Sequence, residues 1–211
     1  MDPFFTIDLS DPHNPKILGE LKIPGYSDYL HPFDEDHIIG VGKDTVESEY
    51  GNFAWYQGLK IALFDVSDFE NPKEVSKILI GDRGTDSPAL YDHKAFLFDK
   101  EKELLVIPVR LCEISDEIKE QYDNYTGSMY GEFTFQGAYV YSLSIENGFE
   151  YKGRVTHLSD EDMLKSGYYA YWGSSILRSL YIDNVLYTIS DGMVKMNNLE
   201  TLDEIDIVQL E

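Results

Sequence analysis

Cysteine is nearly absent from this sequence, since Cys112 is the only one in 211 residues. A single thiol excludes an internal disulfide framework and a zinc site built on cysteines. No run of about eighteen apolar residues is present, so we expect no membrane insertion. A signal peptide is also absent, and the chain passes from Met1 almost directly into a strand pattern. We therefore expect it to be part of a longer protein.

Basic residues are scarce: 17 Lys and Arg stand against 39 Asp and Glu, which gives a formal net charge of −22. So strong a negative charge counts against nucleic acid and anionic membrane surfaces as partners. Hydrophobic residues nevertheless make up 43% and aromatic residues 14% of the chain. The composition therefore predicts a globular domain with a strongly hydrated exterior.

One nine-residue stretch occurs twice. Residues 8–16 read DLSDPHNPK, and residues 65–73, 57 positions later, read DVSDFENPK. Each copy stands between two alternating apolar runs, which is the pattern of strand, turn and strand. Asp and Ser side chains can accept hydrogen bonds from backbone N–H groups two residues on, and Asn-Pro favours a turn over a helix. An internal repeat of this length indicates an array of equivalent β units.

The remaining strand patterns complete this architecture. We predict an all-β fold, a single partial β-propeller over residues 1–211 made of four-stranded antiparallel blades. A leading hairpin covers residues 3–23, and three blades cover about 29–80, 90–157 and 176–210. Asn147-Gly148 predicts a two-residue turn in the third hairpin, and helix is expected only near 115–122 and 160–166. A β-sandwich with a fortuitous duplication is the alternative.

Several stretches resemble a known family. They are Gly58–Ile61 with the motif that begins at Asp65, then Gly25–Pro32, Ala89–Phe96 and Leu104–Val109. They are similar to the LVIVD-type hairpin repeats and to a secreted, mostly archaeal and bacterial, β-propeller family distantly related to WD-40 repeats. The resemblance implies a secreted or cell-surface module and brings no established reaction with it. Ser142–Ile145 departs from the repeated turn motif, which favours a turn role for the Asp and Ser residues.

Propeller geometry places the loops at 43–57, 81–89, 110–136 and 158–175 on one face, here called the upper face. These loops are rich in aromatic residues with polar atoms, which favour interfaces and sugar stacking. We expect them to bind an unknown protein or carbohydrate ligand. Alternatively, they fill the gaps between blades. The candidate binding residues are Trp55, Tyr56, Tyr125, Tyr130, Tyr169 and Trp172.

Asp92 and His93 are the candidates for a site beside the central channel, with His31 nearby in the pattern. No Gly-x-Ser-x-Gly motif accompanies them, and a lone Asp-His pair usually fixes a loop. The Asp-rich turns lack the ligand spacing of a calcium loop, so we expect no metal and no cofactor. We therefore favour a non-enzymatic recognition or scaffold module. The alternative is the C-terminal part of a propeller enzyme with a site near His93, and accidental carboxylate pairs for sugar hydrolysis stay possible.

Two further expectations concern surfaces. Asn124-Tyr125-Thr126 is a glycosylation sequon in the long insertion between two predicted strands. Three blades and a half cannot close a ring, because the leading hairpin would lack its two inner strands. We therefore expect an open arc that self-associates through its blade ends.

Overall fold

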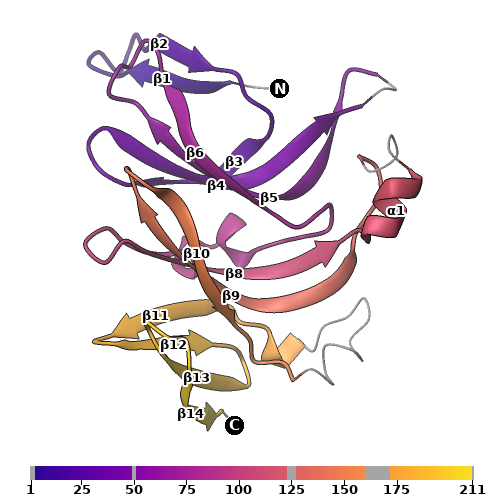
Figure 1. The fold of residues 1–211 in the computed structure, drawn as a ribbon. Helices are drawn as coiled ribbons and strands as arrows, with labels where there is room; N and C mark the ends of the chain where they lie inside the picture. The colour runs from indigo at the N-terminus through magenta and orange to yellow at the C-terminus, as the bar shows by residue number, and fades with distance from the viewer. Residues whose placement is uncertain (1–2, 49–50, 123–126, 160–171, 211) are drawn as a thin grey trace.

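The computed structural model describes residues 3–48, 51–122, 127–159 and 172–210. It contains three four-stranded antiparallel sheets and one two-stranded hairpin, arranged as a fan of successive blades (Figure 1). The leading hairpin lies at one end of the fan and the last sheet at the other, so the arc is open. This confirms the prediction of an all-β partial propeller.

Each sheet is built from strands consecutive in the chain. The hairpin consists of β1 (Phe4–Asp8) and β2 (Lys16–Leu21). The first sheet consists of β3 (Tyr26–Pro32), β4 (His37–Glu47), β5 (Ala54–Asp65) and β6 (Lys73–Ile80). The second consists of β7 (Leu97–Asp99), β8 (Leu104–Glu113), β9 (Glu132–Ser144) and β10 (Gly148–Val155). The third consists of β11 (Arg178–Ile182), β12 (Val185–Ile189), β13 (Met193–Asn198) and β14 (Glu204–Gln209).

Helix is confined to short segments in the described chain. The α-helix α1 (Asp116–Gln121) begins where predicted, after Ser115, whose hydroxyl accepts a bond from the Ile118 amide at 3.4 Å. The 3-10 turns are η1 (Pro88–Leu90), η2 (His93–Ala95) and η3 (Trp172–Ser174). The helix predicted near 160–166 lies outside the described residues. None of the described helices is long and apolar enough to cross a membrane.

The sequence repeat is also a repeat of strand register. β1 pairs with β2 from Asp8 opposite Lys16 to Phe4 opposite Leu21, with a bulge between Thr6 and Ile7. Shifted by 57 residues, the same pairs and the same bulge occur between β5 and β6, where Asp65 lies opposite Lys73. The leading hairpin is therefore equivalent to the two outer strands of the first sheet.

Turn chemistry explains the repeated polar residues. The Asp8 carboxylate accepts a bond from the Ser10 amide at 2.8 Å, and the Asp65 carboxylate accepts one from the Ser67 amide at 2.9 Å. Such bonds between a side chain and the backbone two residues on stabilise tight turns. The predicted turn role is confirmed.

The third hairpin differs from both copies. Gly148 lies opposite Ser144 in the β9–β10 ladder, which leaves three residues in the turn. The prediction of a two-residue Asn147-Gly148 turn was therefore wrong. Gly148 has φ +67°, the left-handed conformation that commonly ends a three-residue hairpin loop.

The hydrophobic core lies between the sheets and follows the alternation of the strands. Leu105, Ile107 and Val109 of β8 pack toward the first sheet, in a cluster with Leu59, Ile61 and other residues of β4 and β5. The neighbouring positions Leu104 and Val106 belong to a second cluster with Ile176 and Leu186 toward the third sheet. β8 is therefore buried on both faces, which is why its sequence reads as a nearly continuous apolar run.

The inner edge of the second sheet is interrupted. β7 pairs only with residues 104–106 of β8, and Asp86 forms an isolated antiparallel bridge to Arg110 further up. Pro108 stands between these points and has no N–H to donate to a ladder. Its carbonyl instead accepts a bond from the Ser87 hydroxyl at 2.6 Å. The chain between the two pairings folds into η1 and η2 and enters the space beside β3.

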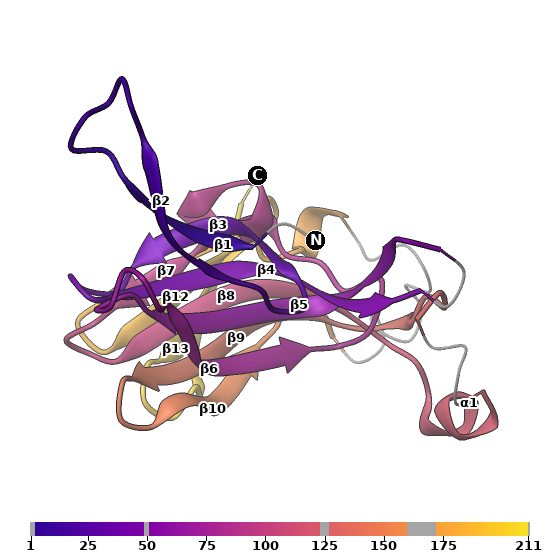
Figure 2. The same cartoon turned by 90° about the horizontal axis from the view of Figure 1, so that it is seen from above.

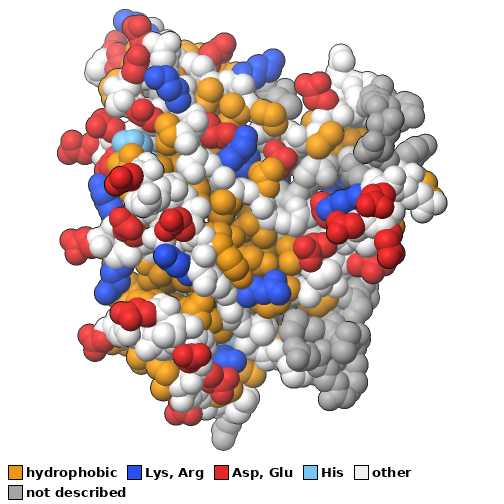
Figure 3. Space-filling view, in the orientation of Figure 1, with side chains coloured by type: hydrophobic (Ala, Val, Ile, Leu, Met, Phe, Trp, Pro, Cys, Tyr) orange, Lys and Arg blue, Asp and Glu red, His pale blue; other side chains and the backbone are white. Residues whose placement is uncertain are grey.

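The loops between the second and third strands of the sheets gather on one side, as predicted for the upper face. In Figure 1 this side is at the right, with the β4–β5 loop and α1, and Figure 2 shows the same grouping from above. The turns that contain Asp8 and Asp65 lie on the opposite side, here called the lower face. Figure 3 shows acidic side chains spread over the molecule and hydrophobic ones gathered in the middle, over β9 and β10.

Candidate functional site

Three tyrosines converge near the upper end of the inner strand β3. Tyr26 opens this strand, and its ring meets the ring of Tyr56 from β5 edge to face, with 5.3 Å between centroids. Gly25 precedes Tyr26 with φ +92°, and a Cβ there would lie 2.5 Å from the Lys43 carbonyl oxygen. Glycine therefore permits the turn that delivers Tyr26. Tyr91, from the segment between η1 and η2, is the third member of this upper tyrosine cluster.

Two carboxylates, those of Asp28 and Asp86, contribute to the raised pKa values of the tyrosines Tyr26 and Tyr91. Burial, followed by the charge of Asp28 and then the neighbouring phenols, raises the pKa of Tyr26 to about 12. Burial also raises the pKa of Asp28, with Lys43 acting in the opposite direction. For Tyr91, burial and then the Asp86 carboxylate raise the pKa. Tyr26 and Tyr91 are therefore neutral hydrogen-bond donors and acceptors at neutral pH, beside carboxylates.

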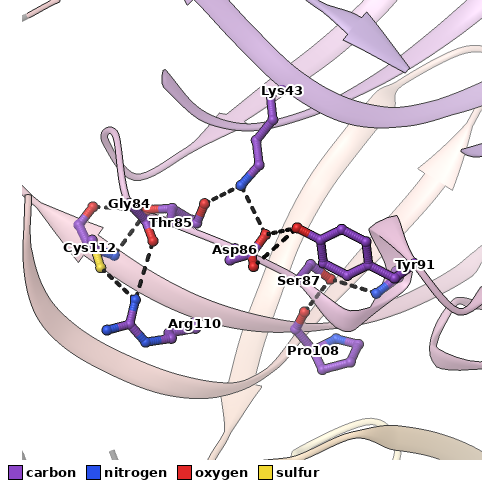
Figure 4. A network of polar contacts seen from close by, with 10 residues as sticks. Lys43, Gly84, Thr85, Asp86, Ser87, Tyr91, Pro108, Arg110 and Cys112 are labelled. Atoms are coloured by element: carbon purple, nitrogen blue, oxygen red, sulfur yellow. Dashed lines mark hydrogen bonds and ion pairs between the residues drawn. The ribbon is translucent and has the colours of Figure 1, made fainter. Parts of the chain in front are cut away.

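A polar network anchors this cluster to the second sheet (Figure 4). The Lys43 ammonium contacts the Asp86 carboxylate at 3.1 Å and the Thr85 carbonyl oxygen. The Tyr91 hydroxyl approaches the same carboxylate at 3.4 Å. Because Lys43 belongs to β4 and Asp86 bridges to β8, the network ties two blades together at their upper ends.

Residues 82–87 are held against β8 by a second group of bonds. The Thr85 hydroxyl and the Cys112 backbone exchange two bonds, both 2.9 Å long. The Arg110 guanidinium lies 3.3 Å from both the Gly84 carbonyl oxygen and the Cys112 sulfur. Burial raises the pKa of the Cys112 thiol, and Arg110 opposes this. Cys112 is accordingly a buried packing residue in this structure.

Arg83 lies between two of the predicted aromatic residues. Its guanidinium carbon is 4.6 Å from the centre of the Trp55 ring and 4.3 Å from that of Tyr130. The guanidinium also donates to the Tyr130 hydroxyl and to the Ser128 carbonyl oxygen, both at 3.2 Å. This stack joins the start of β5 in the first sheet to the β8–β9 insertion of the second, through cation–π contacts.

The structure separates the predicted binding residues into groups. Trp55 is half-buried against Phe53 and Arg83, so it mainly fills a gap between blades. Tyr56 and Tyr130 are exposed by 59% and 62%. Tyr125 and Tyr169 lie outside the described residues, as do the Asn124 sequon and the side chain of Trp172, whose backbone begins η3.

Sequence reasoning missed two members of the cluster. Tyr26 and Tyr91 both lie in stretches that resemble the propeller family, yet neither falls in a predicted binding position. The sequence signal that could have found them was a nearby glycine or proline. Tyr26 follows Gly25 directly, and Tyr91 comes three residues after Pro88, the start of η1. Tyr91 is exposed by 78%.

The Asp92–His93 pair is engaged in loop structure. One Asp92 oxygen accepts a bond from the Lys94 amide at 3.0 Å and caps η2, and the other lies 3.0 Å from Arg178 of β11. His93 is exposed, with its ring 6.4 Å from that of Tyr29. Tyr29 bonds His31 at 2.7 Å, and burial lowers the pKa of His31. Asp92 thus joins the second and third blades, and neither of its oxygens bonds His93.

No group of three or more His, Cys, Asp or Glu residues suited to a metal ion occurs in the part of the chain that the structure describes. The Asp side chains of the lower-face turns bond their own backbone, as shown above for Asp8 and Asp65.

Comparison with known proteins agrees with this arrangement of sheets. The family described as beta propeller domain matches residues 1–202. The chain belongs to that family. An uncharacterized protein of Methanocaldococcus jannaschii is 34% identical over 203 residues, which are 96% of this chain and 23% of that protein. An uncharacterized protein of Archaeoglobus fulgidus is 45% identical over 107 residues, 51% of this chain and 15% of that protein. The chain thus spans less than a quarter of the length of these curated relatives.

Proposed function

We propose that this β-propeller chain is a non-enzymatic recognition or scaffold module that binds its ligand on the upper face. One observation carries the proposal: Tyr56, Tyr91 and Tyr130 expose more than half of their surface on the upper face, where two blades are locked together. Exposed tyrosines on a rigid support offer large contact area at low entropic cost, and tyrosine is enriched at binding surfaces.

The chemistry of the cluster restricts the ligand. The phenols of Tyr26 and Tyr91 are neutral and lie beside Asp28 and Asp86, while the whole chain carries a net charge of −22. An anionic ligand would meet a repulsive field, whereas a neutral carbohydrate or a neutral to cationic protein surface would not. Tyrosine rings also stack on sugars and attract cations. We therefore propose a neutral or cationic carbohydrate or polypeptide as ligand.

The bonding of Asp92 supports a role without catalysis. Both of its carboxylate oxygens are engaged, with the Lys94 amide and with Arg178, so the pair with His93 lacks the base–orienter contact that a catalytic dyad requires. The proposed secreted or cell-surface location rests on the resemblance of the repeat motifs to exported propellers.

The test is a binding screen with matched variants. Wild-type chain, a Tyr56→Ala/Tyr91→Ala variant and a Tyr151→Ala control are applied to arrays of neutral, cationic and anionic oligosaccharides and peptides. Tyr151 is also an exposed tyrosine but belongs to β10, away from the cluster. We expect a neutral or cationic probe to bind wild type and the control, with at least about tenfold weaker binding to the double variant. Equal binding by all three, or binding of anionic probes alone, would contradict the proposal.

A further inference from the structure

An unpaired carboxylate lies within the upper tyrosine cluster. The β3–β4 ladder pairs Ser27 and Tyr29 with consecutive residues of β4, so Asp28 between them is the extra residue of a β-bulge. A bulge takes a side chain out of the regular alternation of its strand. Among the residues that the structure describes, none forms a hydrogen bond or an ion pair with the Asp28 carboxylate. Asp28 is exposed, so a ligand can reach this charge.

The charge of Asp28 acts on two of the three tyrosines. Burial and then Asp28 raise the pKa of Tyr26. Burial, then Asp86 and then Asp28 raise the pKa of Tyr91. The third ring, that of Tyr56, meets the Tyr26 ring edge to face with 5.3 Å between centroids. All three side chains are exposed, so aromatic surface and a carboxylate are presented together.

The local charges do not balance. The ammonium of Lys43 contacts the Asp86 carboxylate at 3.1 Å and the Thr85 carbonyl oxygen (Figure 4). Lys43 is largely buried in this position, and its influence on Asp28 is that of a neighbouring charge without an ion pair. Two carboxylates and one ammonium therefore leave one negative charge beside the rings.

This combination is suited to an organic cation. Faces of aromatic rings attract cations, and a carboxylate adds charge-assisted hydrogen bonds to N–H donors. A metal ion requires several oxygen ligands, and the described part of the chain contains no group of acidic residues suited to one. An anion meets both the unpaired Asp28 and the net charge of −22.

The arrangement of the rings favours an ammonium group over a guanidinium group. Tyr26 and Tyr56 meet edge to face, which forms a corner, whereas a planar guanidinium is best bound by stacking flat on one ring. An ammonium group is compact, and the alkyl stem of a lysine side chain packs along aromatic surface while its charged end reaches a carboxylate.

We propose that the upper tyrosine cluster, together with Asp28, binds the ammonium group of a lysine side chain of a partner polypeptide. The inference rests on the function proposed for the upper face and narrows its ligand to a cation of this class. The ammonium donates to the Asp28 carboxylate, and the lysine stem packs on the exposed rings of Tyr56 and Tyr91.

The first part of the test compares three peptides with the full ¹⁵N-labelled chain. The peptide Gly-Lys-Gly, capped at both ends, is titrated beside two matched peptides in which norleucine or arginine replaces the lysine. Norleucine keeps the alkyl stem and lacks the charge. We expect saturable chemical-shift changes at residues 26–28, 56 and 91 with the lysine peptide, and binding of the other two at least about tenfold weaker.

The second part compares two protein variants. Asp28→Asn keeps the size of the side chain and removes its charge, and no described residue depends on a bond to this carboxylate. Asp183→Asn is the matched control, because Asp183 is also exposed, belongs to the turn between β11 and β12, and changes the net charge by the same amount. We expect Asp28→Asn to weaken binding of the lysine peptide at least about tenfold and Asp183→Asn to leave it unchanged.

Three results would overturn the inference: equal binding by Asp28→Asn and wild type, equal binding of the lysine and norleucine peptides, or tighter binding of the arginine peptide. Each of them leaves the proposed function standing if a neutral probe still binds wild type and is weakened by Tyr56→Ala/Tyr91→Ala. An upper face that binds neither the peptides nor a neutral probe refutes both.

Discussion

His157 shows how a single buried residue joins two blades. Its ring nitrogens bond the Ser190 hydroxyl at 3.0 Å and the Thr188 hydroxyl at 2.9 Å, so the segment after β10 is attached to β12. Burial, and then the nearby charge of Lys195, lower the pKa of His157 to about 4. The neutral ring fits the site, and the charged ring does not.

This predicts a pH dependence of stability. The pKa of His157 in the folded state lies below its ordinary value of 6.5, so His157 contributes fully to the free energy of unfolding above pH 6.5. This contribution is lost as the pH falls toward 4, and the complete loss is about 3 kcal/mol. Urea unfolding between pH 7 and pH 4 should show a steeper loss for wild type than for His157→Gln, which stays neutral. Equal slopes for the two proteins would contradict the assignment.

A second residue-scale prediction concerns the repeated turn. The Asp65 carboxylate accepts bonds from the Ser67 amide at 2.9 Å and from the Ser67 hydroxyl at 2.6 Å. Asp65→Ala should lower the free energy of unfolding by about 1 kcal/mol, typical of a lost intramolecular bond. Glu70→Ala in the same turn serves as control in the same denaturation series, and an equal loss in both variants would show that the Asp65 bonds contribute nothing specific.

At the scale of elements, the inner edge of the second sheet decides where the upper tyrosine cluster lies. Pro108 breaks the ladder, the chain leaves the sheet through η1 and η2, and Tyr91 is carried beside Tyr26. The Ser87 hydroxyl is central to this path, because it donates to the Pro108 carbonyl and accepts from the Ala89 amide.

Ser87→Ala should therefore be costly. Ser87 is buried, and its removal leaves the Pro108 carbonyl without this donor in an apolar setting, which costs about 1–3 kcal/mol. Thr134→Ala removes an exposed bond to Glu113 and should change stability by less than about 0.5 kcal/mol. Thermal unfolding of both variants makes the comparison. A Ser87 variant as stable as the Thr134 variant would rule out this role.

The strand repeat was predictable because its residues act locally: Asp, Ser and Asn-Pro specify the turn, and the alternating runs on either side fix the register. Four-strand grouping followed from the same signals. The interrupted inner strand was not predictable, since it depends on which edge of β8 the Pro108 carbonyl faces. Likewise, Tyr56 is exposed while its sequence neighbour Trp55 is half-buried, because Trp55 packs against the distant Arg83. The members of the upper tyrosine cluster are determined by contacts between residues far apart in the sequence, and not by their spacing along the chain.

At the scale of the whole molecule, the fan is open at both ends. The last sheet exposes apolar side chains, among them Leu180 and Ile182 of β11 and Ile205 of β14. Sheet faces of this kind elsewhere in the molecule are covered by a neighbouring blade. We propose that this end mediates self-association, opposed by the net charge of −22.

Sedimentation should then show a concentration-dependent dimer that strengthens with salt, because salt screens the repulsion between the acidic copies. Ile182→Glu should shift the equilibrium to monomer, while Val75→Glu on β6 should not. A strict monomer for wild type at high salt and high concentration would exclude this contact.

The central claim is that the leading hairpin is the outer half of a blade, open along β1. Hydrogen exchange tests it most directly, because the repeat supplies an internal standard: residues 4–8 and 61–65 share register, bulge and turn. Among the residues that the structure describes, only the second set is paired on both edges. We predict that amides of residues 4–8 exchange faster than those of residues 61–65 by a factor on the order of 100 or more. Equal protection of the two sets would contradict an open hairpin and with it the open arc.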